Sequence, residues 1–233
     1  MFNEVIELGG LGNFSATDLG KMLAGKKVSC STSLGLDSEN VNGSSTPSDL
    51  KTLFELIYLS FTAPRMDEEA YASFENRMKA QLKNLELNPM VAFSDSLTTA
   101  IYENNPRAMR IDAADFKNIS YPRIMEMYKE RFGDASGFVF TFVGNIDTDS
   151  IRPLVEQYLA TLPANGKIEQ GNPKEVPAIR KGDYVNRFKR QMETPKASVV
   201  NFYSGQMDYN LENIVTATMW KQVNDLVYTE KGR

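Results

Sequence analysis

Histidine is absent from all 233 residues of this sequence. Its absence excludes Ser-His-Asp and Cys-His nucleophilic catalysis. It also excludes histidine-ligated zinc and every HExxH or HxxEH metallopeptidase motif. The chemistry that stays open depends on pairs of carboxylates, on lysine or tyrosine side chains, or on hard metal ions bound through oxygen.

Cysteine is nearly absent as well, since the chain has only Cys30. A single cysteine forms no internal disulfide and cannot build a thiolate zinc site. Cys30 alternates with Val28 and Thr32 in a stretch with strand periodicity, so a core side chain is a better interpretation than a reactive thiol. The compartment stays open, because many exported proteins also lack disulfides.

An excess of positive charge and a long apolar run are missing too. Lys and Arg number 26 against 30 Asp and Glu, which gives a formal net charge of −4. A chain without a basic field cannot displace the counterions of a nucleic acid, so we expect no nucleic-acid partner. No apolar run approaches the roughly 20 residues that span a bilayer, and we expect no membrane span. The first residues also lack the basic and apolar regions of a signal peptide.

Apolar residues recur at helical spacing through most of the chain, often after a capping residue. Ser15 or Thr17, Asp67, Ser120, and Asp147 or Thr148 are the expected caps. The predicted helices cover about 3–8, 15–23, 47–62, 68–87, 91–103, 120–132, 148–162 and 211–233.

Five further stretches are predicted as strands. Residues 27–34 and 39–44 flank a short turn and predict an antiparallel hairpin. Residues 138–143 are apolar on both faces apart from Thr141, which predicts a central strand. Residues 187–192 and 197–203 are predicted as strands beyond a stretch rich in Gly, Pro, Asn, Lys and Glu.

The order of these elements predicts an α+β fold, with an antiparallel or mixed sheet and helices packed on one face. We expect a first domain at 1–164, a linker at 165–185 and a second unit at 186–233. The chain begins inside one predicted helix and ends inside another, so we expect both units to be truncated.

Two glycine turns invite a phosphate-binding interpretation that their context does not support. Residues 9–12 have no preceding strand, and a GxGxxG loop needs one. Gly144 follows an apolar stretch, but no Lys-Ser/Thr comes after it, so it is not a Walker loop. We expect both glycine turns only to redirect the chain and not to bind phosphate.

Acidic residues give no defined catalytic or metal site. The run 67–69 could hold Ca²⁺ or Mg²⁺, but acids at a helix N-terminus are explained by the helix dipole. A glycosidase-like pair of carboxylates stays open, because any two acids can meet in space. Nothing in the sequence selects such a pair. We therefore assign no catalytic residue and no metal ligand.

Three stretches of the chain together carry a family resemblance. They are 9-GGLGNFSATDLGKMLAGKKVSCSTSL-34, 43-GSSTPSDLKTLFELIYLSFTAPRMDEEAYASF-74, and the run from 119 that ends in 138-FVFTFVGNIDTDSIRPLVEQYLATLPA-164. In this order they resemble the M16 family of zinc metallopeptidases, the group of pitrilysin, insulinase and the processing peptidases. The resemblance covers nearly all of residues 1–164, and the FVGNID and YLATLP elements are its most specific part.

The resemblance implies a place within a larger protein. M16 chains carry four similar α+β domains, which pair as two halves that close around a peptide, with the HxxEH zinc motif in the first domain. A chain without histidine resembles the third, inactive domain, here residues 1–164 without the N-terminal strand. Residues 186–233 resemble the first strands and helix of the next domain. Arg233 matches an arginine that grips the substrate in the family, and the tyrosine that accompanies it there would lie beyond Arg233.

The function that the resemblance implies is that of a non-catalytic fragment of a zinc-dependent metalloendopeptidase. The fragment would form the wall of the substrate chamber opposite the zinc domain, and zinc would be bound only by the N-terminal half of the parent. Its partners would be a peptide or protein substrate and that catalytic half. A swapped homodimer of the fragment is a further expectation, because residues 197–231 could dock where the first strand is missing. The alternative is a pseudo-peptidase scaffold or assembly subunit with no catalytic parent. For the compartment, the resemblance suggests only a bacterial envelope setting.

Overall fold

The computed structural model describes residues 2–35, 38–166, 168, 177–191 and 196–231. The chain divides into two compact units, Met1–Ala178 and Ile179–Arg233, and each is described by itself. The proposed domain 1–164, linker 165–185 and second unit 186–233 stay predictions.

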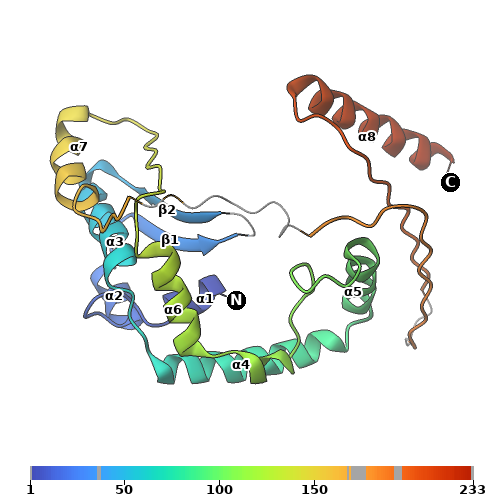
Figure 1. Ribbon diagram of the computed structural model, residues 1–233, viewed down its shortest axis with the longest axis horizontal. Coiled ribbons are helices and arrows are strands. Elements are labelled where there is room, and N and C mark those ends of the chain that lie inside the picture. Colours follow the sequence, from blue (N-terminus) through green and yellow to red (C-terminus); the bar gives the residue numbers. More distant parts are fainter. Residues whose placement is uncertain (1, 36–37, 167, 169–176, 192–195, 232–233) are drawn as a thin grey trace. The chain divides into compact units, whose positions relative to one another are not determined.

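The first unit is rich in helices (Figure 1). Its α-helices are α1 (Phe2–Glu7), α2 (Ala16–Met22), α3 (Leu50–Thr62), α4 (Glu68–Glu86), α5 (Pro89–Tyr102), α6 (Tyr121–Phe132) and α7 (Thr148–Leu154). Short turns of other helix types are η1 (Pro47–Asp49), η2 (Asp115–Asn118) and the π-helical η3 (Val155–Leu159). The strands are β1 (Val28–Leu34) and β2 (Glu39–Ser45).

The helices begin where side chains satisfy the free N–H groups of a first turn. Ser15, Asp67 and Asp147 each accept a hydrogen bond from a backbone N–H two or three residues further on. The three caps were predicted from the sequence and are confirmed. The predicted helices are confirmed within about two residues at most ends, and η2 was not predicted.

The predicted hairpin is confirmed. β1 and β2 pair antiparallel, with Val28 opposite Ser45 and Leu34 opposite Glu39. α3 packs against both strands, and Gly43 of β2 leaves room for the side chain of Leu53. The α+β class with a small antiparallel sheet is therefore confirmed.

Residues 138–143 do not form the predicted central strand. They run extended but pair with no strand in the described part of the chain. Phe138, Phe140 and Phe142 are partly buried, whereas the side chains of Val139 and Val143 are 89% and 93% exposed. The prediction is wrong because an apolar pattern indicates only that side chains are buried. It does not show that another strand is available for backbone hydrogen bonds.

The core of the first unit consists of two clusters, one between α1, α4 and α6 and one between α3 and the residues that follow η3. Their buried members are Val5, Ile6, Phe74, Tyr121, Met125, Tyr128 and Phe132 in the first, and Leu53, Ile57, Phe61 and Leu162 in the second. Phe61 connects the two clusters, because its ring contacts those of Phe132 and Phe138.

The second unit contains the helix α8 (Leu211–Lys231). The predicted strands 187–192 and 197–203 are not confirmed, since their described residues have no regular secondary structure. No described residue of this unit is buried, and apolar side chains such as Val199, Trp220 and Leu226 are mostly exposed. Among the described residues, no helix is both long and apolar enough to cross a membrane.

Candidate functional site

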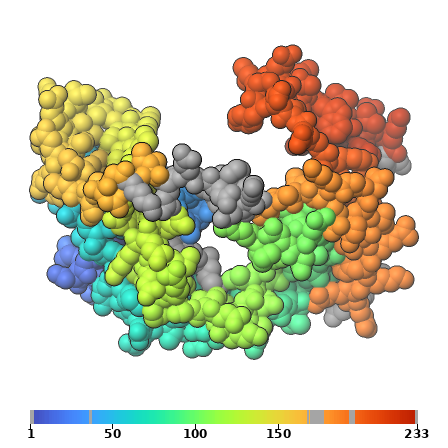
Figure 2. All heavy atoms as spheres, in the orientation of Figure 1, coloured from blue at the N-terminus to red at the C-terminus, as the bar shows by residue number. Residues whose placement is uncertain are grey.

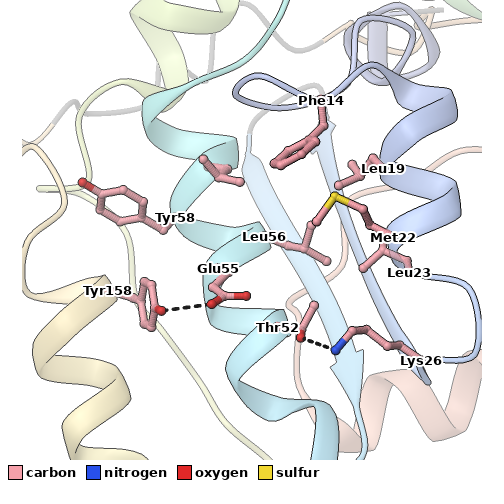
Figure 3. A pocket seen from close by; sticks show the side chains of 11 residues that line it. Phe14, Leu19, Met22, Leu23, Lys26, Thr52, Glu55, Leu56, Tyr58 and Tyr158 are labelled. Atoms are coloured by element: carbon pink, nitrogen blue, oxygen red, sulfur yellow. Dashed lines mark hydrogen bonds between the residues drawn. The ribbon is translucent and has the colours of Figure 1, made fainter.

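A groove of about 530 Å³ lies on the first unit between α2, α3 and η3 (Figure 3). It is mostly apolar. Its apolar walls come from Phe14, Leu19, Met22, Leu23, Leu56 and Leu59, and its polar groups from Lys26, Thr52, Glu55, Tyr58 and Tyr158. Phe14 and Met22 remain 38% and 54% exposed, so apolar surface is open at the α2 side of the groove.

The groove exists because helix α2 covers α3 only in part. No residue of α2 is buried. The helix is held near α3 by its flanking turns, where the N–H of Gly12 donates to the carbonyl of Ala63 at 2.8 Å. At the other end, the Lys26 ammonium donates to the Thr52 hydroxyl at 3.1 Å. Apolar residues of α2 therefore face α3 without closing the space between them.

Tyr158 reaches the opposite wall from a π-helical turn. Pro153 lies inside α7 and has no N–H to donate to the preceding turn, which disturbs regular α-helical pairing. The chain continues as η3, in which the N–H of Ala160 donates to the carbonyl of Val155. π-Helical turns of this kind are frequent at functional sites.

The Tyr158 side chain links η3 to α3. Its hydroxyl donates to Glu55 Oε1 at 3.2 Å (Figure 3). Its ring lies edge-on to Tyr58, with centroids 6.1 Å apart. Burial, and then the nearby Glu55 carboxylate, raise the pKa of Tyr158, so its hydroxyl stays neutral and remains a donor.

The polar groups of the groove are engaged with one another rather than arranged for catalysis. Glu55 accepts from Tyr158 and lies 3.7 Å from the Lys51 ammonium. Lys26 contacts Thr52 and lies 3.9 Å from Asp49. The arrangement offers an apolar binding surface with a polar rim.

Cys30 is a core side chain, as the sequence predicted. Burial raises the pKa of its thiol to about 11, and its Sγ lies 3.9 Å from the Ser60 hydroxyl. A thiol that is protonated at neutral pH is a poor nucleophile. The structure therefore gives Cys30 no catalytic role.

The acidic run 67–69 is likewise explained by its surroundings. Asp67 accepts from the N–H of Ala70 and from the Arg65 guanidinium at 3.0 and 3.1 Å. These hydrogen bonds lower the pKa of its carboxyl. Within the described ranges, no group of three or more Cys, Asp or Glu side chains is placed to hold a metal ion. Arg233, the predicted substrate-binding residue, lies outside the described residues.

The groove itself was not found from the sequence. Its residues come from three stretches, and their apolar positions fit ordinary helix packing equally well. The one signal that could have located it is Pro153 within a helical pattern, since an internal proline marks an irregular turn.

The first comparison, with models of protein families, indicates which class of protein this chain resembles. Residues 118–217 match the family model described as "Peptidase M16 inactive domain". Residues 118–217 are thus similar to an inactive domain of the peptidase M16 family, and the resemblance found in the sequence is confirmed.

Individual relatives agree with this assignment. A 116-residue stretch, 49% of this chain and 12% of the relative, is 27% identical to "Zinc protease PQQL-like" of Arabidopsis thaliana. The "Probable zinc protease PqqL" of Haemophilus influenzae is 18% identical over 208 residues, 89% of this chain and 22% of the relative. The chain therefore spans about a fifth or less of the length of these curated relatives.

Solved structures show the same fold. The periplasmic protease PqqL of Escherichia coli matches with a TM-score of 0.62 and 20% identity, over 74% of this chain and 19% of that one. The ferredoxin protease FusC, solved in complex with Arabidopsis ferredoxin, matches with a TM-score of 0.58 and 21% identity, over 72% and 19%. An M16 inactive domain from Pseudomonas fluorescens matches with a TM-score of 0.56 and 19% identity, over 74% and 43%.

Proposed function

We propose that this chain is a non-catalytic part of a zinc-dependent M16 metalloendopeptidase and forms the chamber wall opposite the zinc domain. The observation that carries the proposal is the match of residues 118–217 to an inactive M16 domain in a chain without histidine. Relatives named as zinc proteases support the zinc dependence of the parent. The solved E. coli relative is described as periplasmic, which supports an envelope setting for the parent.

In the parent, the N-terminal half and this chain would have different roles, because they carry different residues. The N-terminal half would bind zinc through HxxEH, and its glutamate would act as general base on the zinc-activated water. This chain would supply no group to that step. Its part would be to hold an extended peptide against the chamber wall, by strand addition at an open edge, and to exclude bulk water when the halves close.

Peptide cleavage by the isolated chain and by the full-length parent tests the proposal. With a quenched fluorescent peptide library and added Zn²⁺, we expect no turnover by the chain alone. We expect turnover by the parent, and its loss in the presence of a chelator. Turnover by the isolated chain that a chelator abolishes would refute the proposal.

A scaffold role is the second candidate, and the lack of any cluster of metal-ligating side chains in the described ranges is compatible with both candidates. In this case the full-length protein would have no zinc half that cleaves peptides. The coding sequence upstream decides between the two candidates. An HxxEH motif followed by a downstream glutamate supports the peptidase, and its absence supports the scaffold.

The substrate contact that we propose for this chain is Arg233. A guanidinium can bind a peptide carbonyl or carboxylate with two parallel hydrogen bonds. The proposal rests on the likeness of 226-LVYTEKGR-233 to the family's substrate-binding run. Arg233 would act from the second unit, across the chamber from the zinc.

We also propose two partners for this chain. The first is the N-terminal catalytic half of the parent. The second arises when the chain is isolated, where residues 197–231 would exchange between two copies as a swapped homodimer. The support is that no described residue of the second unit is buried, although the unit carries many apolar side chains.

A further inference from the structure

The sequence holds two Asn-Gly dipeptides, and the structure places them in different surroundings. In such a dipeptide the glycine backbone nitrogen can attack the asparagine side-chain amide, because glycine has no side chain to hinder the approach. Asn42 and Gly43 lie within β2 and pair with β1. Asn165 and Gly166 lie outside the helices and strands, and both are exposed. The backbone around the two asparagines is therefore held in different ways.

The second dipeptide is bound to the loop that follows α6. The N–H of Ala135 donates to the carbonyl of Pro163 at 2.8 Å. The N–H of Asn165 donates to Asp134 Oδ1 at 3.3 Å. In Figure 2, atoms of the segment that follows η3, coloured between yellow and orange, lie at the surface of the first unit. These hydrogen bonds lie within the first unit and hold the dipeptide beside the Asp134 carboxylate.

Two hydrogen bonds in series join the Gly166 nitrogen to that carboxylate. The N–H of Gly166 donates to Ser136 Oγ at 2.8 Å. The Ser136 hydroxyl in turn donates to Asp134 Oδ1 at 2.6 Å. The same Oδ1 accepts from the Ser136 N–H at 3.0 Å, which fixes the carboxylate in this position. A hydroxyl placed between a donor and a carboxylate can pass a proton from one to the other, as general-base catalysis requires.

We propose that Asn165 is a site of spontaneous modification, at which Asp134 and Ser136 act as the base for ring closure. The Gly166 nitrogen forms a bond to Cγ of Asn165, and the bond from Cγ to the side-chain nitrogen breaks. The proton of Gly166 passes through the Ser136 hydroxyl to Asp134 and then to the leaving nitrogen, which departs as ammonia. Water is the only co-reactant, and it opens the succinimide to aspartate or to isoaspartate.

The direction of the Gly166 hydrogen bond suits this reaction. A peptide nitrogen attacks through electrons perpendicular to the peptide plane, whereas its N–H lies in that plane. The contact with Ser136 can therefore take the proton without blocking the attack. At the first dipeptide, ring closure needs a backbone rotation that the pairing of β2 with β1 resists.

Modification would alter the point where the predicted linker, residues 165–185, begins. Both products carry a carboxylate in place of the neutral amide, close to Asp134, and two neighbouring carboxylates repel each other. Isoaspartate also adds a carbon to the backbone, which displaces the Gly166 N–H from Ser136. The modified chain should therefore lose the contacts that bind this segment to the loop after α6. The inference does not rest on the proposed peptidase role.

Incubation of the full chain at neutral pH tests the site. Peptide mass spectrometry, with enzymatic methylation specific for isoaspartate, measures conversion at both asparagines of the same sample. Asn165 should convert at least roughly tenfold faster than Asn42, because only Asn165 has the base beside it. Conversion at Asn165 that is equal to or slower than conversion at Asn42 overturns the proposal.

Ser136→Ala and Asp134→Asn test the base. Each variant should slow conversion at Asn165 by roughly tenfold or more and leave conversion at Asn42 unchanged. A loop that was merely loosened would react faster, so a slower reaction distinguishes a base from a structural contact. Ser136→Thr is the matched control, because it keeps the hydroxyl and should keep most of the rate. Circular dichroism confirms that the variants fold. An unchanged or faster reaction in Ser136→Ala would show that these hydrogen bonds protect Asn165, and would overturn the proposed role of Asp134 and Ser136.

Discussion

At the scale of single residues, the structure gives structural roles to Cys30 and Asp67, although both belong to chemically reactive residue types. Cys30 packs beneath α3 with a protonated thiol, and Asp67 is a helix cap bound by Arg65. A chain without histidine therefore has no activated nucleophile at either position. This agrees with the non-catalytic role that we propose for the chain.

The Cys30 thiol should react slowly in the folded chain. Its pKa is raised from 9.0 to about 11, mainly by burial, so roughly 100-fold less thiolate is present at neutral pH than in the unfolded chain. Alkylation by iodoacetamide, followed by mass spectrometry with and without urea, should show at least this difference in rate. Equal rates would contradict the burial of Cys30.

The same shift affects stability in alkaline solution. The folded-state pKa lies above the unfolded value, so the contribution of Cys30 to stability is complete below about pH 9. It is lost as the pH rises toward 11, because the unfolded thiol ionises first. The difference in unfolding free energy between the unchanged chain and Cys30→Ser should therefore shrink over this range.

Arg233 should matter for turnover in the full-length parent if the proposed substrate contact exists. Removing a charge-assisted hydrogen bond costs about 1.5–3 kcal/mol, so Arg233→Ala should lower kcat/KM by roughly tenfold to a hundredfold. Arg233→Lys should retain part of the activity, because it keeps the charge but loses the two-pronged geometry. The control Lys231→Ala should have little effect, and an unchanged kcat/KM for Arg233→Ala would remove Arg233 from the site.

At the scale of elements, a hydrogen bond joins helices α6 and α3. Within α3, the carbonyl of Ser60 would accept from the N–H four residues on, but this residue is Pro64 and has none. The Tyr128 hydroxyl of α6 takes its place and donates to that carbonyl at 2.7 Å. The carbonyl that has no backbone donor at the end of α3 is thus hydrogen-bonded by a side chain of α6.

Tyr128→Phe should destabilise the fold, since it leaves the Ser60 carbonyl buried without this donor. We expect a loss of about 1–3 kcal/mol in the free energy of unfolding, measured by urea denaturation. Tyr158→Phe is the matched control, because its hydroxyl bonds to the half-exposed Glu55, and it should cost less. Equal losses for the two variants would contradict this account.

Close packing of α3 on β2 is testable at Gly43. A Cβ at this position would lie 2.5 Å from Leu53 Cδ1. Gly43→Ala should therefore cost about 1–3 kcal/mol through overpacking. Gly20→Ala is the control, because α2 leaves open space there and a helix gains roughly 1 kcal/mol from the change. Thermal and urea unfolding should show a loss of stability for Gly43→Ala and a gain for Gly20→Ala.

At the scale of the whole molecule, the chain is a small part of much longer relatives, about a fifth of the H. influenzae protein. Its second unit has no buried residue among those described, and α8 exposes Trp220 and Leu226. Apolar surface of this extent usually marks an interaction site. The proposed partners, the catalytic half and a second copy, would each cover it.

Hydrogen exchange of the α8 amides should show whether a partner covers this helix. In the isolated chain at low concentration, amides of α8 should exchange quickly, because tertiary packing supplies most helix stability. In the full-length parent they should be strongly protected. Strong protection in the dilute isolated chain would show that α8 needs no partner.

Local patterns in the sequence predicted the helices, their caps and the hairpin, because capping residues such as Ser15 and Asp67 and the spacing of apolar residues act over a few positions. The family followed from the order of its motifs. Tertiary structure decided what depends on distant residues. It left 138–143 without a paired strand among the described residues, since a strand needs a partner that no local pattern supplies. It also brought Tyr158 to Glu55 across the groove, because only folding places η3 beside α3.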